Sequence, residues 1–166
     1  MARSTGGRHR RYTRGRKIRI VGPVFDHDYV QSHVRLFSAA HVEWVGELGG
    51  PAKTAALHDA SVFVHTYGRT SVEAGAAVFG ESLRAGTPMA ALTWRTGTGT
   101  CAEAALCTQT GVITVAHPDE DDEAAAHLLA CAIEKAEDLD HGQVQEIGLR
   151  RFDPARHFSA VAGRSC

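Results

Sequence analysis

The sequence predicts an α/β protein with a doubly wound, mostly parallel sheet. Short apolar runs alternate with helix-like segments along the chain, and the runs are typical of buried strands rather than of strands with one solvent face. With 166 residues, of which 43% are hydrophobic, the chain has the length for one compact core. Helices are therefore expected on both faces of a single sheet.

Each expected strand is a short apolar or alternating run bounded by turn residues. The five runs, in chain order, are KIRIVGP at 17–23, VEWVGEL at 42–48, ASVFVHT at 60–66, MAALTW at 89–94 and GVITV at 111–115.

The expected helices lie between and after these runs. Pro51 suits the first position of one helix, and Gly86 with Pro88 ends another. An acidic N-terminal turn near residue 120 favours the helix dipole of the C-terminal part. The expected helical segments are 28–40, 51–60, 76–85, 101–107 and the C-terminal part from 119 through 162.

The head of the chain differs from its body. Residues 1–16 are rich in Arg, Gly, Ser and Thr without a hydrophobic period, which predicts a basic, disordered head before an ordered domain at 17–166. The four cysteines form no CxxC motif, so free thiols are expected. No run reaches the roughly 18 apolar residues of a membrane span. These features predict a cytoplasmic protein.

A ligand site is expected where the strand at 60–66 leads into the helix at 76–85. In doubly wound sheets, ligands bind outside the carboxyl ends of the strands, where loops and helix N-termini meet. The small side chains of YGRTSVEAGAA, residues 67–77, would let a ligand approach the backbone, and N–H groups at a helix start suit a phosphate. The alternative is that residues 67–77 only connect the strand to the helix and bind no ligand, since such a connection can have the same composition.

Two glutamates flank this helix start. Glu73 precedes the helix, and Glu81 lies about 7 to 8 Å along the axis from Ala76 at a rise of 1.5 Å per residue. That is roughly the distance from a pyrophosphate to a ribose in a bound nucleotide. A carboxylate at that distance can accept hydrogen bonds from the two vicinal hydroxyls of the ribose. The alternative is an exposed Glu81 weakly paired with Arg84. Spacing alone leaves both interpretations open.

The stretch from Glu73 to Met89 resembles a family signature. Its E-x7-E followed by SLRAGTP is similar to the E-x-F-G-x-x-x-x-E-A-L-A-x-G-T-P-V pattern of retaining GT-B glycosyltransferases of the glycogen-synthase-like, family 4 kind. Residues 17–162 resemble the C-terminal, Rossmann-like donor-binding domain of that family in the order of their motifs. One departure is that Ala74-Gly75-Ala76 stand where the family has its F-G.

The resemblance implies roles for particular residues. Glu73 would lie beside the donor sugar as the catalytic residue, and Glu81 would bind the nucleotide ribose. Backbone N–H groups of Gly75, Ala76 and Ala77 would hold the diphosphate. His65, which ends its strand beside this site, is a further candidate for substrate binding.

The implied reaction transfers a sugar from a UDP-, GDP- or ADP-sugar to an acceptor hydroxyl with retention, without a metal or other cofactor. Stabilisation of the leaving diphosphate would supply much of the catalysis. The family takes an Arg and a Lys from a GR…P.KG segment that has no counterpart here, and the acceptor domain is not recognisable either. Whether the chain is an enzyme therefore stays open. It could work with a separate N-terminal Rossmann-domain chain, or be a truncated, catalytically silent binding domain.

Other motifs give weaker indications. The ten histidines have no zinc-like spacing, so no metal site is expected. The glycines of RTGTGT at 95–100 lack the Lys-Ser/Thr end of a P-loop. The basic head could bind nucleic acid through phosphates, but a solvated tail is the preferred interpretation.

Overall fold

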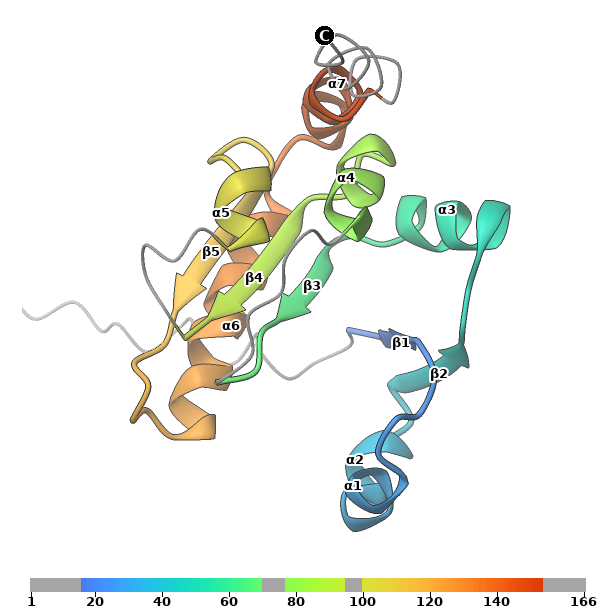
Figure 1. Ribbon diagram of the computed structural model, residues 1–166, viewed down its shortest axis with the longest axis vertical. Coiled ribbons are helices and arrows are strands. Elements are labelled where there is room, and N and C mark those ends of the chain that lie inside the picture. The colour runs from blue at the N-terminus through green and yellow to red at the C-terminus, as the bar shows by residue number, and fades with distance from the viewer. Residues whose placement is uncertain (1–15, 70–76, 95–99, 154–166) are drawn as a thin grey trace, which may run out of the picture. The chain divides into compact units, whose positions relative to one another are not determined.

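The computed structural model describes residues 16–69, 77–94 and 100–153 (Figure 1). By its contacts the chain forms two compact units, residues 1–53 and 54–166. The predicted basic head lies almost entirely outside the described residues, so its disorder stays a prediction. Each unit is described by itself below.

The first unit is built on two parallel strands. Strand β1 (Ile18–Val21) pairs with β2 (Val42–Gly46), with Ile18 opposite Val42 and Ile20 opposite Trp44. The indole Nε1 of Trp44 donates to the carbonyl of Gly22 at 2.8 Å. This bond ties the turn after β1 to β2.

The helix expected at 28–40 is two helices. Helix α1 (His27–Ser32) begins at Asp26, whose side chain accepts the N–H of Tyr29, and α2 (Val34–Phe37) follows directly. His33 separates them because its backbone, at φ −113° and ψ 23°, is not helical. Helix α3 (Gly50–His58) then leads toward the second unit, beginning one residue before the predicted Pro51.

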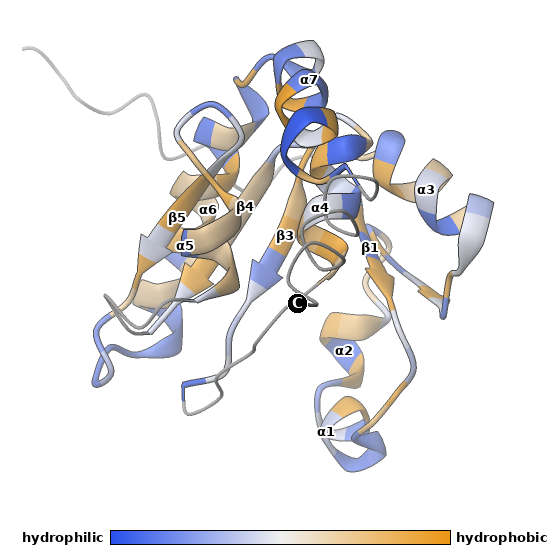
Figure 2. Cartoon of the chain, turned by 45° about the horizontal axis from the view of Figure 1, so that its top comes forward, coloured by the Kyte–Doolittle hydropathy of each residue, from blue (hydrophilic) through white to orange (hydrophobic). Residues whose placement is uncertain are grey.

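The second unit contains a three-stranded parallel sheet in the order β3-β4-β5. The strands are β3 (Phe63–Thr66), β4 (Met89–Thr93) and β5 (Gly111–Val115). All five residues of β4 are buried, as expected of a central strand with both faces covered. Figure 2 shows these strands mainly in hydrophobic colours. All three lie within predicted strand segments.

Helices cover both faces of this sheet, which confirms the predicted fold class. Met89 and Ala91 of β4 belong to a core cluster with residues of α4 (Ala77–Arg84), α5 (Cys101–Ala105) and α7 (His141–Arg151). The alternate residues Ala90 and Leu92 pack with residues of α6 (Asp122–Glu137). Neighbouring side chains of a strand point to opposite faces, so one strand supplies both layers. Figure 1 shows α5 and α6 on opposite sides of the sheet.

The SLRAGTP stretch ends α4 and starts β4. Gly86 has a positive φ of 83°, a conformation that glycine adopts without strain. The N–H of Thr87 donates to the Ser82 carbonyl at 3.0 Å, and that of Gly86 to the Leu83 carbonyl at 3.1 Å, as at other glycine-terminated helices. The buried Thr87 hydroxyl also donates to the Leu57 carbonyl. This stretch therefore sets where α4 stops.

Candidate functional site

The candidate site is the carboxyl edge of the β3-β4-β5 sheet. Because the three strands are parallel, their carboxyl ends lie at one edge, and the helices that follow them begin there. Helix α4 begins at Ala77, α5 follows its N-cap Thr100, and α6 follows its N-cap Asp121. Three helix starts thus gather at this edge.

Two of these helix starts are closed by the chain's own side chains. At α5, the Thr100 side chain accepts the N–H of Glu103 and the Glu103 carboxylate accepts the N–H of Thr100, a capping box. The N–H of Ala102 donates to the Tyr67 hydroxyl at 3.1 Å. At α6, Asp121 caps the helix and the first turn is acidic, which disfavours an anionic ligand.

The start of α4 has a different character. Its first turn contains no acidic residue, and Ala77 there is exposed. An uncharged first turn at the positive end of a helix is compatible with an anion. The predicted diphosphate ligands Gly75 and Ala76, and the predicted catalytic Glu73, lie outside the described residues.

Glu81 is half-buried in the second turn of α4, between buried Gly80 and Ser82. Intermediate burial of this side chain is compatible with both interpretations of Glu81. Its proposed partner Arg84 donates from the guanidinium to the Phe152 carbonyl at 3.0 Å, beyond the end of α7. Arg84 thus serves the contact between α4 and the end of α7. The ribose role of Glu81 stays a prediction.

His65 belongs to an aromatic cluster. Its ring meets Tyr67 edge-on, with the ring centroids 4.7 Å apart, and Phe79 of α4 at 4.9 Å. Edge-to-face contacts of this kind stabilise a core. These ring contacts place half-buried His65 in the aromatic part of the core, and its role in substrate binding stays a prediction.

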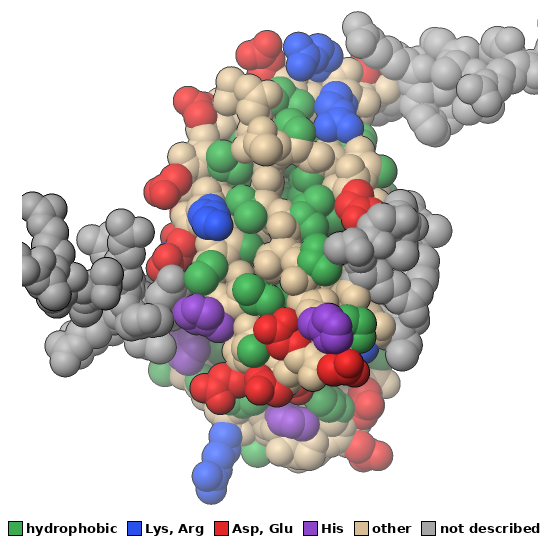
Figure 3. All heavy atoms as spheres, turned by 90° about the vertical axis from the view of Figure 1, so that its left-hand side faces the viewer, with side chains coloured by type: hydrophobic (Ala, Val, Ile, Leu, Met, Phe, Trp, Pro, Cys, Tyr) green, Lys and Arg blue, Asp and Glu red, His purple; other side chains and the backbone are tan. Residues whose placement is uncertain are grey.

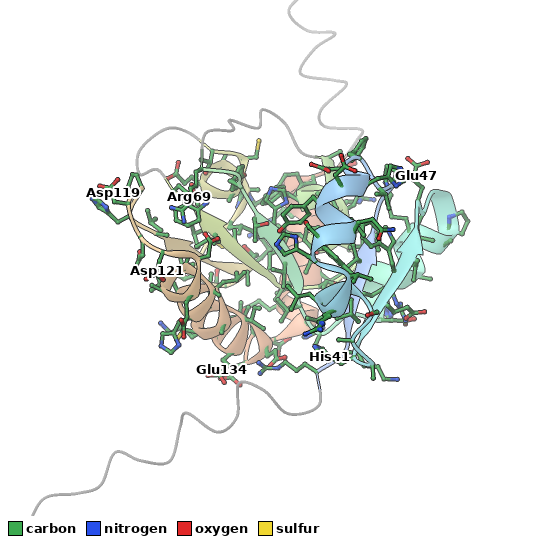
Figure 4. All side chains as sticks on the ribbon, turned by 90° about the horizontal axis from the view of Figure 1, so that it is seen from below. His41, Glu47, Arg69, Asp119, Asp121 and Glu134 are labelled. Atoms are coloured by element: carbon green, nitrogen blue, oxygen red, sulfur yellow. The ribbon has the colours of Figure 1, made fainter. Side chains whose placement is uncertain are left out.

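Nothing in the sequence singled out Arg69, which makes three side-chain contacts at this edge. The Arg69 guanidinium lies over the ring of Trp94, 3.8 Å from its centroid. Its Nη1 donates to the Pro118 carbonyl at 2.8 Å, and its Nη2 to the Asp122 carboxylate at 2.7 Å. Figure 4 shows Arg69 on the same side of the molecule as Asp119 and Asp121, near the start of α6. The only available signal was an arginine three residues beyond the end of a strand.

The described part of the chain contains neither a disulfide nor a metal site of three or more side chains. Among the described residues no cysteine forms a disulfide with another, and no group of three or more His, Cys, Asp and Glu could hold a metal ion. Within the same residues, no helix is both long and apolar enough to cross a membrane. A hydrogen bond from the Thr110 side chain lowers the pKa of the Cys107 thiol.

Charge is unevenly distributed on the face of the molecule drawn in Figure 3. Acidic and histidine side chains gather toward one end of it, whereas Lys and Arg side chains are scattered. Binding to a nucleic-acid backbone depends on clustered positive charge. The visible face lacks such a cluster among the described residues.

The fold is shared with proteins of known structure, one of which is a glycosyltransferase. AviGT4, a glycosyltransferase involved in avilamycin A biosynthesis, superimposes with a TM-score of 0.63 and 20% identity, over 90% of this chain and 42% of its own. Anabaena Alr3699/HepE, solved with UDP-glucose and with UDP, gives a TM-score of 0.64 and 21% identity, over 89% of this chain and 40% of its own. The chain thus spans less than half the length of either protein. No protein-family model and no curated protein sequence matches it.

Proposed function

We propose that the chain is a nucleotide-sugar-binding domain of glycosyltransferase type. The observation that carries the proposal is the arrangement at the carboxyl edge of the parallel sheet. There a helix start without acidic residues precedes a half-buried glutamate on the same helix. Proteins that share the fold include a glycosyltransferase and a protein solved with UDP-glucose. A UDP-sugar is accordingly the first ligand to test, followed by GDP- and ADP-sugars.

In the proposed binding mode, different parts of the nucleotide sugar bind at different positions along α4. Backbone N–H groups of Gly75, Ala76 and Ala77 hold the diphosphate at the helix start, where the dipole favours negative charge. Glu81, one turn further along, accepts hydrogen bonds from the two ribose hydroxyls. Glu73 lies beside the sugar. Retention at the anomeric carbon and transfer without a metal follow from the family resemblance and are part of the proposal.

Catalysis requires more than this domain. The leaving diphosphate needs cationic stabilisation, and the sequence has no counterpart of the family's Arg and Lys segment. The neighbours of known structure are more than twice as long as the aligned part. We therefore propose that transfer needs an acceptor domain besides residues 1–166, and that residues 1–166 by themselves bind the donor without turning it over.

Calorimetry with UDP tests the proposal directly. Wild type and Glu81→Ala are titrated with UDP, GDP, ADP and their sugars. Hydrogen bonds to a charged group contribute about 1.5–3 kcal/mol, so Glu81→Ala should lower the affinity at least tenfold. Glu81→Gln keeps one acceptor oxygen and should lose less.

Glu134→Ala is the matched control. Glu134 is also a half-buried glutamate on a helix, but it lies far from Arg69 and the carboxyl edge (Figure 4). Its replacement should leave the affinity unchanged. Absence of nucleotide binding at millimolar concentration, or equal affinity of Glu81→Ala and wild type, contradicts the site. Sugar transfer by residues 1–166 alone would contradict the proposed need for an acceptor domain, and it would also exclude the catalytically silent alternative.

A further inference from the structure

Helix α6 carries a histidine and a cysteine that contact each other on its surface. His127 and Cys131 are four positions apart, and residues with this spacing are neighbours on one side of a helix. The imidazole Nε2 of His127 and the thiol Sγ of Cys131 are 3.9 Å apart. The structure thus brings a nitrogen and a sulfur ligand together outside the candidate nucleotide site.

The helix backbone holds this pair in place. The buried residues of α6 are Ala125, Ala132 and Ala136, which pack in the core clusters with β4. At about 100° of rotation per residue, His127 and Cys131 lie on the opposite side of the helix from these alanines. His127 is exposed and Cys131 is half-buried. A dissolved ion can therefore reach the pair on a helix whose other side is anchored in the core.

The distance between the two atoms suits one shared metal ion. Zn²⁺ binds a histidine nitrogen at about 2.0–2.1 Å and a thiolate sulfur at about 2.3 Å, so two such ligands of a tetrahedral ion are about 3.5 Å apart. The observed distance of 3.9 Å is longer by about 0.4 Å. A small side-chain rotation closes this difference without a change in the backbone.

The chemistry of the pair and its surroundings favour a soft cation. Sulfur and imidazole nitrogen select ions such as Zn²⁺, whereas Mg²⁺ and Ca²⁺ prefer oxygen ligands. Glu123 lies one turn before His127, and Glu134 lies one turn after Cys131, so carboxylates follow the pair along its side of the helix. Lys135, the basic residue of the last turn, opposes their charge only in part.

We propose that His127 and Cys131 bind a soft divalent metal ion such as Zn²⁺. The cysteine binds as a thiolate, so its proton passes to the solvent when the ion binds. Within the described residues these two side chains are not part of a larger group of metal ligands, and water or another molecule fills the remaining positions of the ion. Histidine spacing did not predict the pair, because zinc motifs are recognised from sets of three or four ligands.

Titration of the reduced, metal-free full chain with Co²⁺ tests this site. Co²⁺ substitutes for Zn²⁺, and its bond to a thiolate gives a charge-transfer absorption in the near ultraviolet. We expect this band to saturate and then to disappear when Zn²⁺, which binds such sites more tightly, is added. Cys131→Ser should abolish the band. His127→Ala should weaken Co²⁺ binding at least tenfold, because a direct ligand is lost.

Two controls separate the pair from other thiols and histidines. Cys107→Ser removes a half-buried thiol whose side-chain partner is Thr110, and it should leave the titration unchanged. A double variant combines His127→Ala with Ala126→His at an exposed position, which keeps a histidine on α6 but rotates it away from Cys131 by about 100°. It should not restore the affinity. Circular dichroism checks that every variant is folded.

Absence of a thiolate band for the wild type at millimolar Co²⁺ overturns the inference. A band that persists in Cys131→Ser, unchanged affinity of His127→Ala, or full recovery in the double variant also overturns it. The inference does not depend on the proposed function, since the titration contains no nucleotide.

Discussion

Replacing Gly148 by alanine should separate two helices that support the candidate site. A Cβ at Gly148 of α7 would overlap the Leu83 carbonyl group and come within 2.6 Å of the Arg84 nitrogen, both on α4. These are backbone atoms, so no side-chain rotation relieves the contact. Since ordinary contact begins at 3.4 Å, the helices must move apart by about 0.8 Å or more.

The expected loss of stability is the difference between two opposing effects. Overpacking a core costs about 1–3 kcal/mol, and the value here belongs at the upper end because the obstacle is backbone. Alanine stabilises a helix by about 1 kcal/mol relative to glycine. Gly148→Ala should therefore lower the free energy of unfolding by about 2 kcal/mol, which corresponds to about 4–8 °C in the unfolding temperature.

Urea and thermal unfolding, followed by circular dichroism, measure this loss. Gly49→Ala is the control, because a Cβ there meets no atom within 4 Å and Gly49 has no positive φ. It should change the stability by no more than about 0.5 kcal/mol. Because Glu81 lies on α4, Gly148→Ala should also weaken nucleotide binding. If Gly148→Ala is as stable as wild type, the close approach of α4 and α7 is refuted.

Three smaller perturbations follow from the same structure. Thr100→Ala removes the α5 cap and should cost about 1 kcal/mol in urea unfolding, and an unchanged midpoint would contradict the capping box. Trp44→Phe removes the bond to the carbonyl after β1 and should cost about 1 kcal/mol in thermal unfolding; no loss would argue against that bond. The lowered pKa of Cys107 means that its thiolate forms at a lower pH than that of an ordinary thiol. Thr110→Val should raise this pKa and slow iodoacetamide labelling of Cys107 near neutral pH, as read by peptide mass spectrometry, and equal rates would exclude the hydroxyl as its cause.

Local features of the second unit could be predicted because the signals are local. The run at 89–94 is apolar throughout, and its strand is buried on both faces. Gly86 and Pro88 predicted the end of a helix. Helix α4 ends at Arg84, and Gly86 just after it has a positive φ. Short-range backbone chemistry decides such positions, and it can be read from neighbouring residues.

Features that depend on distant residues could not be predicted. The sequence indicated one sheet, whereas the described strands form a pair, β1-β2, and a triplet, β3-β4-β5. Strand pairing depends on contacts between residues that are far apart in the sequence. The composition of a strand does not show which other strand will lie beside it. The same holds for Arg69, whose partner Asp122 is 53 positions away. Residue spacing gives no sign of such a pair.

The two parts of the stretch EAGAAVFGESLRAGTP, residues 73–88, have different roles. From Ser82 onward the stretch is accounted for by folding, since Gly86 ends α4 and the buried Thr87 binds the backbone of α3 at Leu57. Changes there should alter stability before they alter binding. In the part from Glu73 to Glu81, Val78 and Phe79 pack in the core, and residues 73–76 lie outside the described residues. Evidence for a ligand must therefore come from variants in this first half, with those in the second half as controls for folding.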